Sequence, residues 1–139
     1  MNLDLANAIV ASALEYRRTN GMKPLTVAAI DSGGHLVALQ REDGTSNLRA
    51  EIAQGKAKGA VAMGLGSRAL FNRAQEQPFF ISAMNALNGG SLVPVPGGVL
   101  IRKNGDLIGA IGITGDSSDN DEACAVAAIE GMGLTAEPG

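Results

Sequence analysis

The sequence predicts an α+β domain whose antiparallel sheet is covered on both faces. Two pairs of apolar segments are joined by short glycine-containing turns, at 31–34 and 104–105, and strands joined so tightly must run antiparallel. The segments 25–30 and 107–113 carry apolar residues on both faces, whereas a sheet with one face in water would alternate. Helices or a second subunit must therefore cover both faces. The length suits a single domain over the whole chain, 1–139.

The first half of the chain predicts a helix, a hairpin and a second helix. Apolar residues at helical spacing indicate a helix over 2–19, and the Asn-Gly pair at 20–21 tolerates the left-handed conformation of a helix end. Strands are expected over 25–30 and 35–40, around a glycine-rich turn. A stripe of alanines then predicts the second helix over 47–63.

The second half predicts further helices, a second hairpin and a last helix. Asn104-Gly105 is a strong hairpin signal. We expect Asp119 to cap the last helix, with Glu122 three residues later completing a capping box. The segments expected, in order, are a short helix over 68–72, a helix opening at Pro78, an interrupted strand region over 92–98, strands over 99–103 and 107–113, and the last helix.

Composition narrows the function classes. The net charge of −3 and the shortage of aromatic residues argue against nucleic-acid binding, which needs clustered cations and stacking platforms. The single cysteine, Cys124, excludes an internal disulfide. The sequence shows no secretory leader pattern, and its longest apolar run is far below the ~20 residues of a membrane span. We therefore expect a cytoplasmic protein that binds neither nucleic acid nor a membrane.

Three segments carry a resemblance to a known family. They read Asp31-Ser-Gly-Gly-His-Leu-Val-Ala-Leu, Glu51-Ile-Ala-Gln-Gly-Lys-Ala, and Pro96-Gly-Gly-Val followed by Ile108-Gly-Ala-Ile-Gly-Ile-Thr-Gly. In this order and spacing, the chain resembles the haem-binding and haem-degrading family typified by HbpS and GlcG, from about residue 5 to 134. The Asp-Glu start of the last helix, at 121–122, also matches.

The resemblance implies a fold, an assembly and a ligand. The fold is a profilin-like antiparallel sheet of about five strands, flanked by helices on both faces, and the assembly is a tetramer or octamer. Some members bind haem or free iron, so haem is a candidate ligand, although no cofactor is required. The chain departs from the family pattern at Lys58-Gly59, where an aromatic residue is common, and at Val99-Leu100, where Val-Pro is usual.

His35 is the only histidine, so any haem-ligand or proton-transfer role of an imidazole falls to it. The plainer interpretation is a residue at the strand edge that makes a turn hydrogen bond. The chain cannot supply the Cys and His sets of a structural zinc site.

Lys56 lies on a helix that is otherwise rich in Ala and Gly, and it could present its ammonium to a carboxylate or propionate. The alternative is a lysine whose aliphatic stem lies along the surface. Arg41 and Glu51 could pair with each other, flank a ligand pocket, or be ordinary surface charges.

Pro96-Gly97-Gly98 is the best candidate among the loops, because consecutive glycines expose backbone N–H groups that can bind anionic oxygen. The competing explanation is a bend where the chain enters a strand. Asp121 and Glu122 are weak candidates for binding a cation through carboxylate oxygens, and otherwise are helix-start carboxylates favoured by the macrodipole.

Two function hypotheses follow. The first is a small-ligand-binding oligomer that takes haem or a related anionic small molecule, with a binding site drawn from His35, Arg41, Glu51, Lys56 and Pro96–Gly98. The second is a cofactor-free enzyme of isomerase, lyase or hydrolase type that acts on a small carboxylate or carbonyl metabolite. In it, Lys56 or His35 would transfer a proton, and the Gly97 and Gly98 amides would stabilise an oxyanion.

Overall fold

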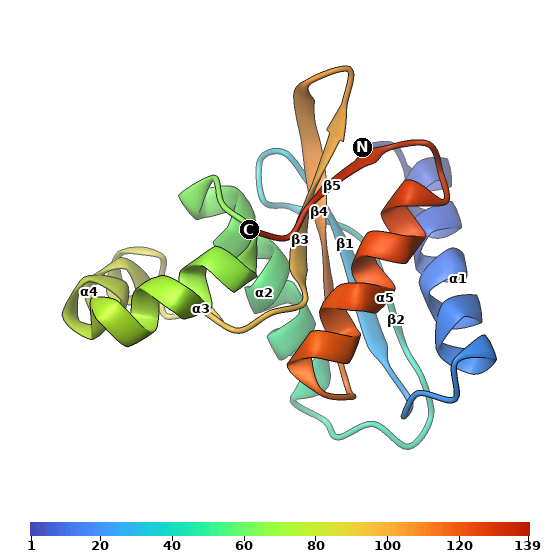
Figure 1. Ribbon diagram of the computed structural model, residues 1–139, viewed down its shortest axis with the longest axis horizontal. Coiled ribbons are helices and arrows are strands. Elements are labelled where there is room, and N and C mark those ends of the chain that lie inside the picture. The colour runs from blue at the N-terminus through green and yellow to red at the C-terminus, as the bar shows by residue number, and fades with distance from the viewer.

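The computed structural model describes residues 1–139 and contains five helices and five strands (Figure 1). In chain order they are α1 (Leu3–Thr19), β1 (Thr26–Asp31), β2 (Leu36–Arg41), α2 (Arg49–Met63), α3 (Ser67–Glu76), α4 (Pro78–Leu87), β3 (Gly98–Lys103), β4 (Asp106–Thr114), α5 (Ser118–Glu130) and β5 (Thr135–Glu137).

The strands form one antiparallel sheet in the order β2-β1-β4-β3-β5. Both predicted hairpins are present, and each has a register shift near its turn, between Ala29 and Ile30 and between Ile101 and Arg102. Asn104 has a φ of 52°, the left-handed conformation that an Asn-Gly turn requires. The α+β class and the five-stranded sheet are thus confirmed.

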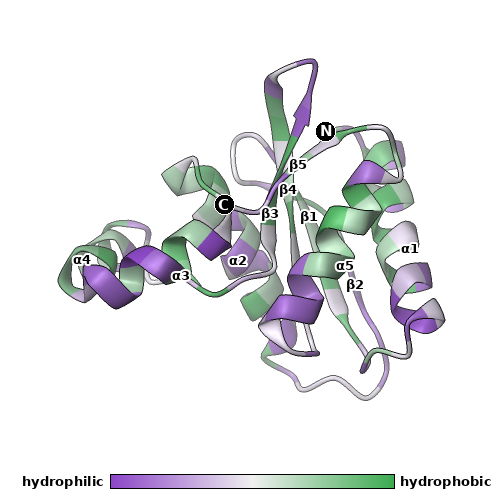
Figure 2. Cartoon of the chain, viewed as in Figure 1, coloured by the Kyte–Doolittle hydropathy of each residue, from purple (hydrophilic) through white to green (hydrophobic).

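Helices cover both faces of the sheet, as the doubly apolar strands predict. α1 and α5 lie together on one face and α2 lies on the other (Figure 1). The larger core joins α1 and α5 to buried side chains of the three central strands, among them Val27, Val99 and Ile111. The hydrophobic colour follows these central strands, and the β3–β4 tip is hydrophilic (Figure 2). Burying each large aliphatic side chain contributes about 1.5–3 kcal/mol.

α2 lies unusually close to the sheet because glycines face it. A Cβ on Gly112 of β4 would lie 1.8 Å from the carbonyl oxygen of Ala53, and one on Gly98 of β3 would lie 2.3 Å from the carbonyl oxygen of Lys56. Both distances are far inside van der Waals contact, so only glycine fits at these positions. This close packing sets how near the side chains of α2 lie to the backbones of β3 and β4.

Three sequence predictions differ from the structure. The capping residue of α5 is Ser117, whose hydroxyl accepts the amide of Asn120, so the predicted Asp119–Glu122 capping box is wrong. The segment 92–97 is not a strand, because its two prolines lack amide donors and the sheet begins only at Gly98. β5 was not expected: it is three residues long, and its pairing with β3 defines it.

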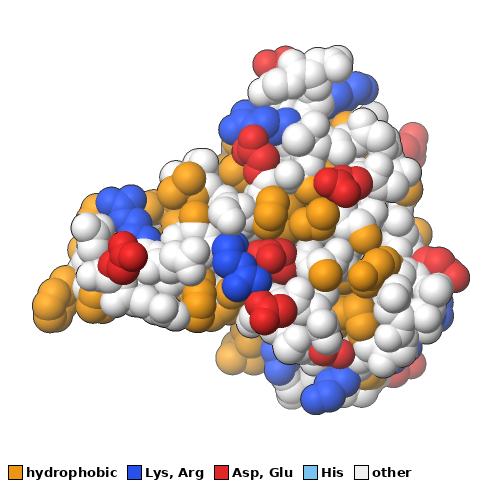
Figure 3. All heavy atoms as spheres, in the orientation of Figure 1, with side chains coloured by type: hydrophobic (Ala, Val, Ile, Leu, Met, Phe, Trp, Pro, Cys, Tyr) orange, Lys and Arg blue, Asp and Glu red, His pale blue; other side chains and the backbone are white.

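α3 and α4 form an arm that extends away from the sheet (Figure 1). α4 buries only Ile81, whereas Phe79 is 91% exposed and Leu87 is 80% exposed. Hydrophobic side chains gather at the far end of this arm, while acidic and basic side chains are mixed over the rest of the face (Figure 3). No helix combines the length and the apolar character that a bilayer crossing requires.

Candidate functional site

Lys56 is enclosed between α2, β4 and α5 rather than displayed on the surface. Its Nζ donates to the carbonyl oxygen of Ile113 at 2.8 Å and to Asp121 Oδ2 at 3.1 Å. The Lys56 side chain is 2% exposed and that of Asp121 is 1% exposed. The expectation of a lysine stem lying along the surface is therefore wrong, and the ammonium has no opening toward a bound molecule.

The Lys56–Asp121 pair is an ion pair in a low-dielectric interior. Burial lowers the pKa of Lys56, and the charge of Asp121 opposes that shift. Burial likewise raises the pKa of Asp121, opposed by Lys56 and by the backbone N–H of Asp116, which donates to Asp121 Oδ1 at 3.0 Å. Either charge would be costly to bury without its partner, so each group needs the other in order to stay charged in the interior.

The Pro96–Gly98 segment packs directly against Lys56. The amide of Gly98 donates to the buried Ser67 Oγ at 2.7 Å, so this N–H is not free to bind an anion. Gly97 has a φ of 120°, and a Cβ there would lie 2.9 Å from Lys56 Nζ. The glycines therefore serve close packing at the start of β3, in agreement with the competing explanation. Pro96 lines the edge of a hollow of about 280 Å³ near Arg68 and Phe71.

The carboxylates at the start of α5 are paired with cations of other helices. Arg68 of α3 donates to both carboxylate oxygens of Glu122, at 3.1 and 3.0 Å, and also pairs with Asp119. Asp121 is paired with Lys56. No three His, Cys, Asp or Glu side chains lie together as a metal site. The structure thus places Asp121 and Glu122 in ion pairs that join α5 to α2 and α3.

His35 stands at the end of the β1–β2 turn. Asp31 Oδ1 accepts the backbone N–H groups of Gly33 and His35, each at 2.9 Å, and lies 3.3 Å from His35 Nδ1. The amide of His35, followed by that of Gly33, holds the pKa of Asp31 below its usual value, so this carboxylate is ionised at neutral pH. The imidazole is 81% exposed, and its Nδ1 edge faces Asp31.

A shallow hollow of about 150 Å³ adjoins this turn, and we call it the hairpin hollow. It combines an apolar wall from α2 with one ammonium, that of Lys58, which forms no ion pair. Its lining residues are Gly33, Gly34, Lys58, Val61, Ala62, Asn88 and Ser91.

The predicted site residues do not all meet. His35 precedes β2 and Arg41 ends it, which places them roughly 20 Å apart along an extended strand. Lys56 bonds to Ile113, which lies at the Arg41 end of the sheet, since Ile113 pairs with Val27. Arg41 and Glu51 are exposed and form no ion pair with each other. Lys56 contacts both Pro96–Gly98 and Asp121, whereas His35 and Arg41 lie at opposite ends of β2.

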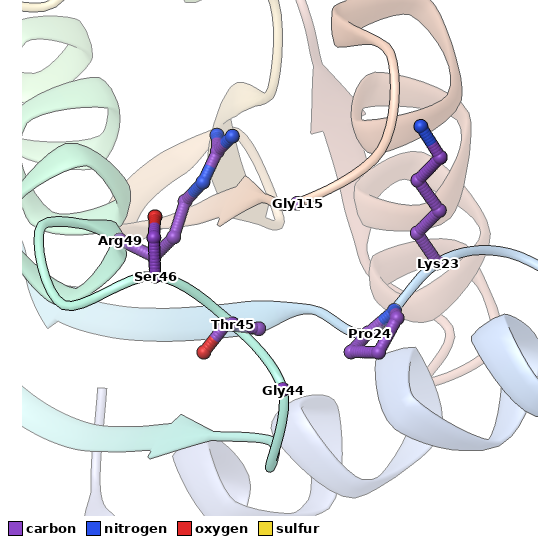
Figure 4. A pocket seen from close by; sticks show the side chains of 7 residues that line it. All are labelled: Lys23, Pro24, Gly44, Thr45, Ser46, Arg49 and Gly115. Carbon is purple, nitrogen blue, oxygen red and sulfur yellow. The ribbon is translucent and has the colours of Figure 1, made fainter.

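A polar pocket of about 220 Å³, which none of the sequence predictions includes, lies near the beginning of α2, and we call it the basic pocket (Figure 4). Arg49 and Lys23 flank it, with Pro24 and Thr45 between them (Figure 4). One signal was present in the sequence: Arg49 places a cation in the first turn of a helix, where the macrodipole favours anions. The lining residues are Lys23, Pro24, Gly44, Thr45, Ser46, Arg49 and Gly115.

Known proteins match this chain in sequence. The family model described as haem degrading protein HbpS-like matches residues 1–130. Protein GlcG of Escherichia coli strain K12 is 31% identical over 114 residues, which cover 82% of this chain and 81% of that protein. An uncharacterised 15.0 kDa protein of Citrobacter freundii, from the dhaT-dhaS intergenic region, is 26% identical over 126 residues, which cover 91% of this chain and 84% of the relative.

Solved structures share the fold. The PduOC:haem complex superposes with a TM-score of 0.85 at 25% identity and covers 96% of both chains. HbpS superposes with a TM-score of 0.81 at 24% identity, covering 95% of this chain and 89% of the other. The family model and the GlcG relative both match most of this chain, and its order of strands and helices agrees with them. The chain therefore belongs to the HbpS-like family.

Proposed function

We propose that this protein binds haem, or a related anionic and partly apolar small molecule, at the hairpin hollow beside His35. Membership of the HbpS-like family supports a haem-related role. The similar PduOC structure is a complex with haem, and it matches nearly the whole chain. Of the residues in the sequence-based hypothesis, the proposal keeps His35 and leaves out Arg41, Glu51 and Pro96–Gly98. Lys58 takes the part first given to Lys56.

The geometry of Asp31 and His35 carries this proposal. A histidine that ligates a metal commonly gives its other ring nitrogen to a carboxylate, which fixes the tautomer and raises the basicity of the ligand. Here Asp31 Oδ1 lies 3.3 Å from His35 Nδ1, which leaves Nε2 of an exposed ring available. Because the chain has only one histidine, His35 would be its sole imidazole ligand to a haem iron.

The hairpin hollow suits one edge of such a ligand. Val61 and Ala62 offer an apolar wall, and the Lys58 ammonium is free to pair with a propionate. At about 150 Å³ the hollow is too small to enclose a porphyrin, because pockets that bury a drug-sized ligand span roughly 300–1,000 Å³. A second subunit would cover the rest, which fits a tetramer or octamer.

Titration with haem, followed by absorbance, tests the proposal. We expect a saturable Soret shift for the wild-type protein and a weaker, altered shift for His35→Ala. Lys103→Ala, at the exposed tip of the β3–β4 hairpin, removes one cation outside the hollow and should bind like the wild type. If micromolar haem produces no saturable change in the folded wild-type protein, the proposal fails.

The geometry favours this binding role over the enzyme hypothesis. That hypothesis gives proton transfer to Lys56 or His35 and gives the stabilisation of an oxyanion to the Gly97 and Gly98 amides. The Lys56 ammonium is bonded to Ile113 and Asp121 in the interior, and the Gly98 amide is bonded to Ser67.

A further inference from the structure

We infer that the basic pocket is a second binding site, which takes the carboxylate or phosphate group of a small polar molecule. It is separate from the hairpin hollow and goes beyond the proposed haem-binding function. Apart from Pro24, its lining consists of glycines and of polar or cationic side chains. Its volume of about 220 Å³ equals that of roughly seven liquid waters, which suits a ligand of a few carbon atoms.

Arg49 is the main observation. It is half-buried, it pairs with no carboxylate, and its one side-chain hydrogen bond runs from Nη1 to Thr114 Oγ1 at 2.7 Å. That bond fixes the guanidinium while its other N–H groups remain available. A planar, pre-oriented guanidinium favours bidentate binding of a carboxylate or phosphate.

The surroundings of Arg49 contribute further positive potential to the pocket. Lys23 flanks the pocket from the other side, and its ammonium forms no ion pair. α2 begins at Arg49, and its N-cap residue is Leu48, whose side chain makes no capping bond. The amides of the first helical turn therefore contribute the positive end of a helix dipole.

Two acidic side chains that neighbour the pocket in sequence, Asp116 and Glu42, accept other hydrogen bonds. Asp116 accepts the backbone N–H groups of Lys23 and Ser117 and a side-chain N–H of Asn120. Glu42 accepts the amide of Leu25 and pairs with Arg17. Neither carboxylate forms an ion pair with a side chain of the basic pocket, while the Lys23 amide and, to a smaller extent, the Lys23 charge hold the pKa of Asp116 below its usual value.

A buried hydroxyl that lies opposite Thr114 in the sheet, outside the lining of the pocket, is also unused. Thr114, which holds Arg49, pairs with Thr26 across the β1–β4 ladder, so the two side chains lie on the same face. Thr26 Oγ1 is buried and has no hydrogen-bond partner. A buried hydroxyl without a partner is rare in folded proteins, and it leaves an unused donor beside the residue that positions Arg49.

Isothermal titration calorimetry with malonate and with inorganic phosphate, at low ionic strength, tests this inference. The wild-type protein should bind at least one of them saturably, with affinity that falls as salt is added. The anion that binds more tightly shows whether the pocket prefers a carboxylate or a phosphate. Arg49→Ala should weaken binding about tenfold or more. Lys23→Ala should weaken it less, and Lys103→Ala should match the wild type.

Thermal melts of each variant, followed by circular dichroism, distinguish misfolding from a loss of binding. Arg49→Lys keeps the positive charge but lacks the planar guanidinium, and it should bind the anion with intermediate affinity. The inference is overturned if neither anion binds the folded wild-type protein, or if Arg49→Ala and Lys103→Ala bind equally well. Haem titration of Arg49→Ala distinguishes the two sites: an unchanged Soret shift supports separate sites, and an abolished shift contradicts them.

Discussion

Lys56 and Asp121 form an ion pair inside the protein, with 3.1 Å between Nζ and Oδ2 and no more than 2% of either side chain exposed. The two residues are 65 positions apart in sequence and join α2 to α5. Lys56 also bonds to the carbonyl oxygen of Ile113, at the end of β4. This contact therefore ties helices from the two faces of the sheet together at one end.

Breaking this pair should destabilise the fold strongly. Lys56→Met or Asp121→Asn leaves an uncompensated buried charge, and each should lower the free energy of unfolding by about 3–5 kcal/mol. The double variant should cost clearly less than the sum, because neither charge then remains. Urea unfolding followed by circular dichroism measures all four proteins. Strictly additive costs would show that the two side chains do not interact.

Gly98 should not tolerate a side chain. Its Cβ would lie 2.3 Å from the carbonyl oxygen of Lys56 and 2.9 Å from Ser67 Oγ, so Gly98→Ala must push α2 away from β3. We expect a loss of about 1–3 kcal/mol in unfolding free energy, or more, by urea titration. Gly131→Ala is the control, because Gly131 has a helical φ of −59° and its nearest neighbour lies 3.1 Å from the new Cβ. Equal stabilities of the two variants would contradict the close packing.

Asp116 should make stability depend on acid pH. Hydrogen bonds from the Lys23 amide, the Asn120 side chain and the Ser117 amide hold its pKa below the usual 3.8. Below pH 3.8, the unfolded chain therefore binds a proton that the folded protein does not, and stability falls as pH falls. The stability difference between the wild type and Asp116→Asn should be full above this pH and should vanish below the folded pKa. Urea midpoints over this range measure it, and a constant difference would contradict the assignment.

Most helices and strands could be predicted from the sequence because the residues that determine each of them lie within that segment or its adjoining turn. The apolar stripe that includes Ile9 and Val10 defines α1, and Asn104-Gly105 defines the second hairpin. β5 had no such signal, since its three residues gain their structure only by pairing with β3. The cap of α5 lies two residues earlier than predicted, at Ser117 rather than Asp119, because both residue types are favoured caps and spacing alone does not decide between them.

The candidate site was predicted less well, because side-chain partners depend on tertiary packing. Spacing placed Lys56 on an Ala- and Gly-rich helix, but nothing local indicated that Asp121 would neutralise it in the interior. The sequence did single out the turn that ends at His35, because that motif is local. It did not indicate that Lys58, rather than Lys56, would line the adjoining hollow.

Lys58 should matter for haem binding only through a carboxylate of the ligand. Lys58→Ala removes the unpaired ammonium of the hairpin hollow and should weaken haem binding a few-fold, because a partly exposed ion pair contributes up to about 1 kcal/mol. Haem dimethyl ester, which lacks the propionate charges, should bind the wild type and this variant alike. Fluorescence or absorbance titration measures both ligands. An equal loss for haem and for its ester would remove the propionate assignment.

The absorbance spectrum of the haem complex, recorded with and without free imidazole, tests the central claim most directly. The wild-type protein should show an imidazole-ligated Soret band, since His35 is the only histidine. His35→Ala should lose that band and regain it when imidazole is added. An unchanged spectrum for His35→Ala without imidazole would show that another group holds the iron, and would contradict the account.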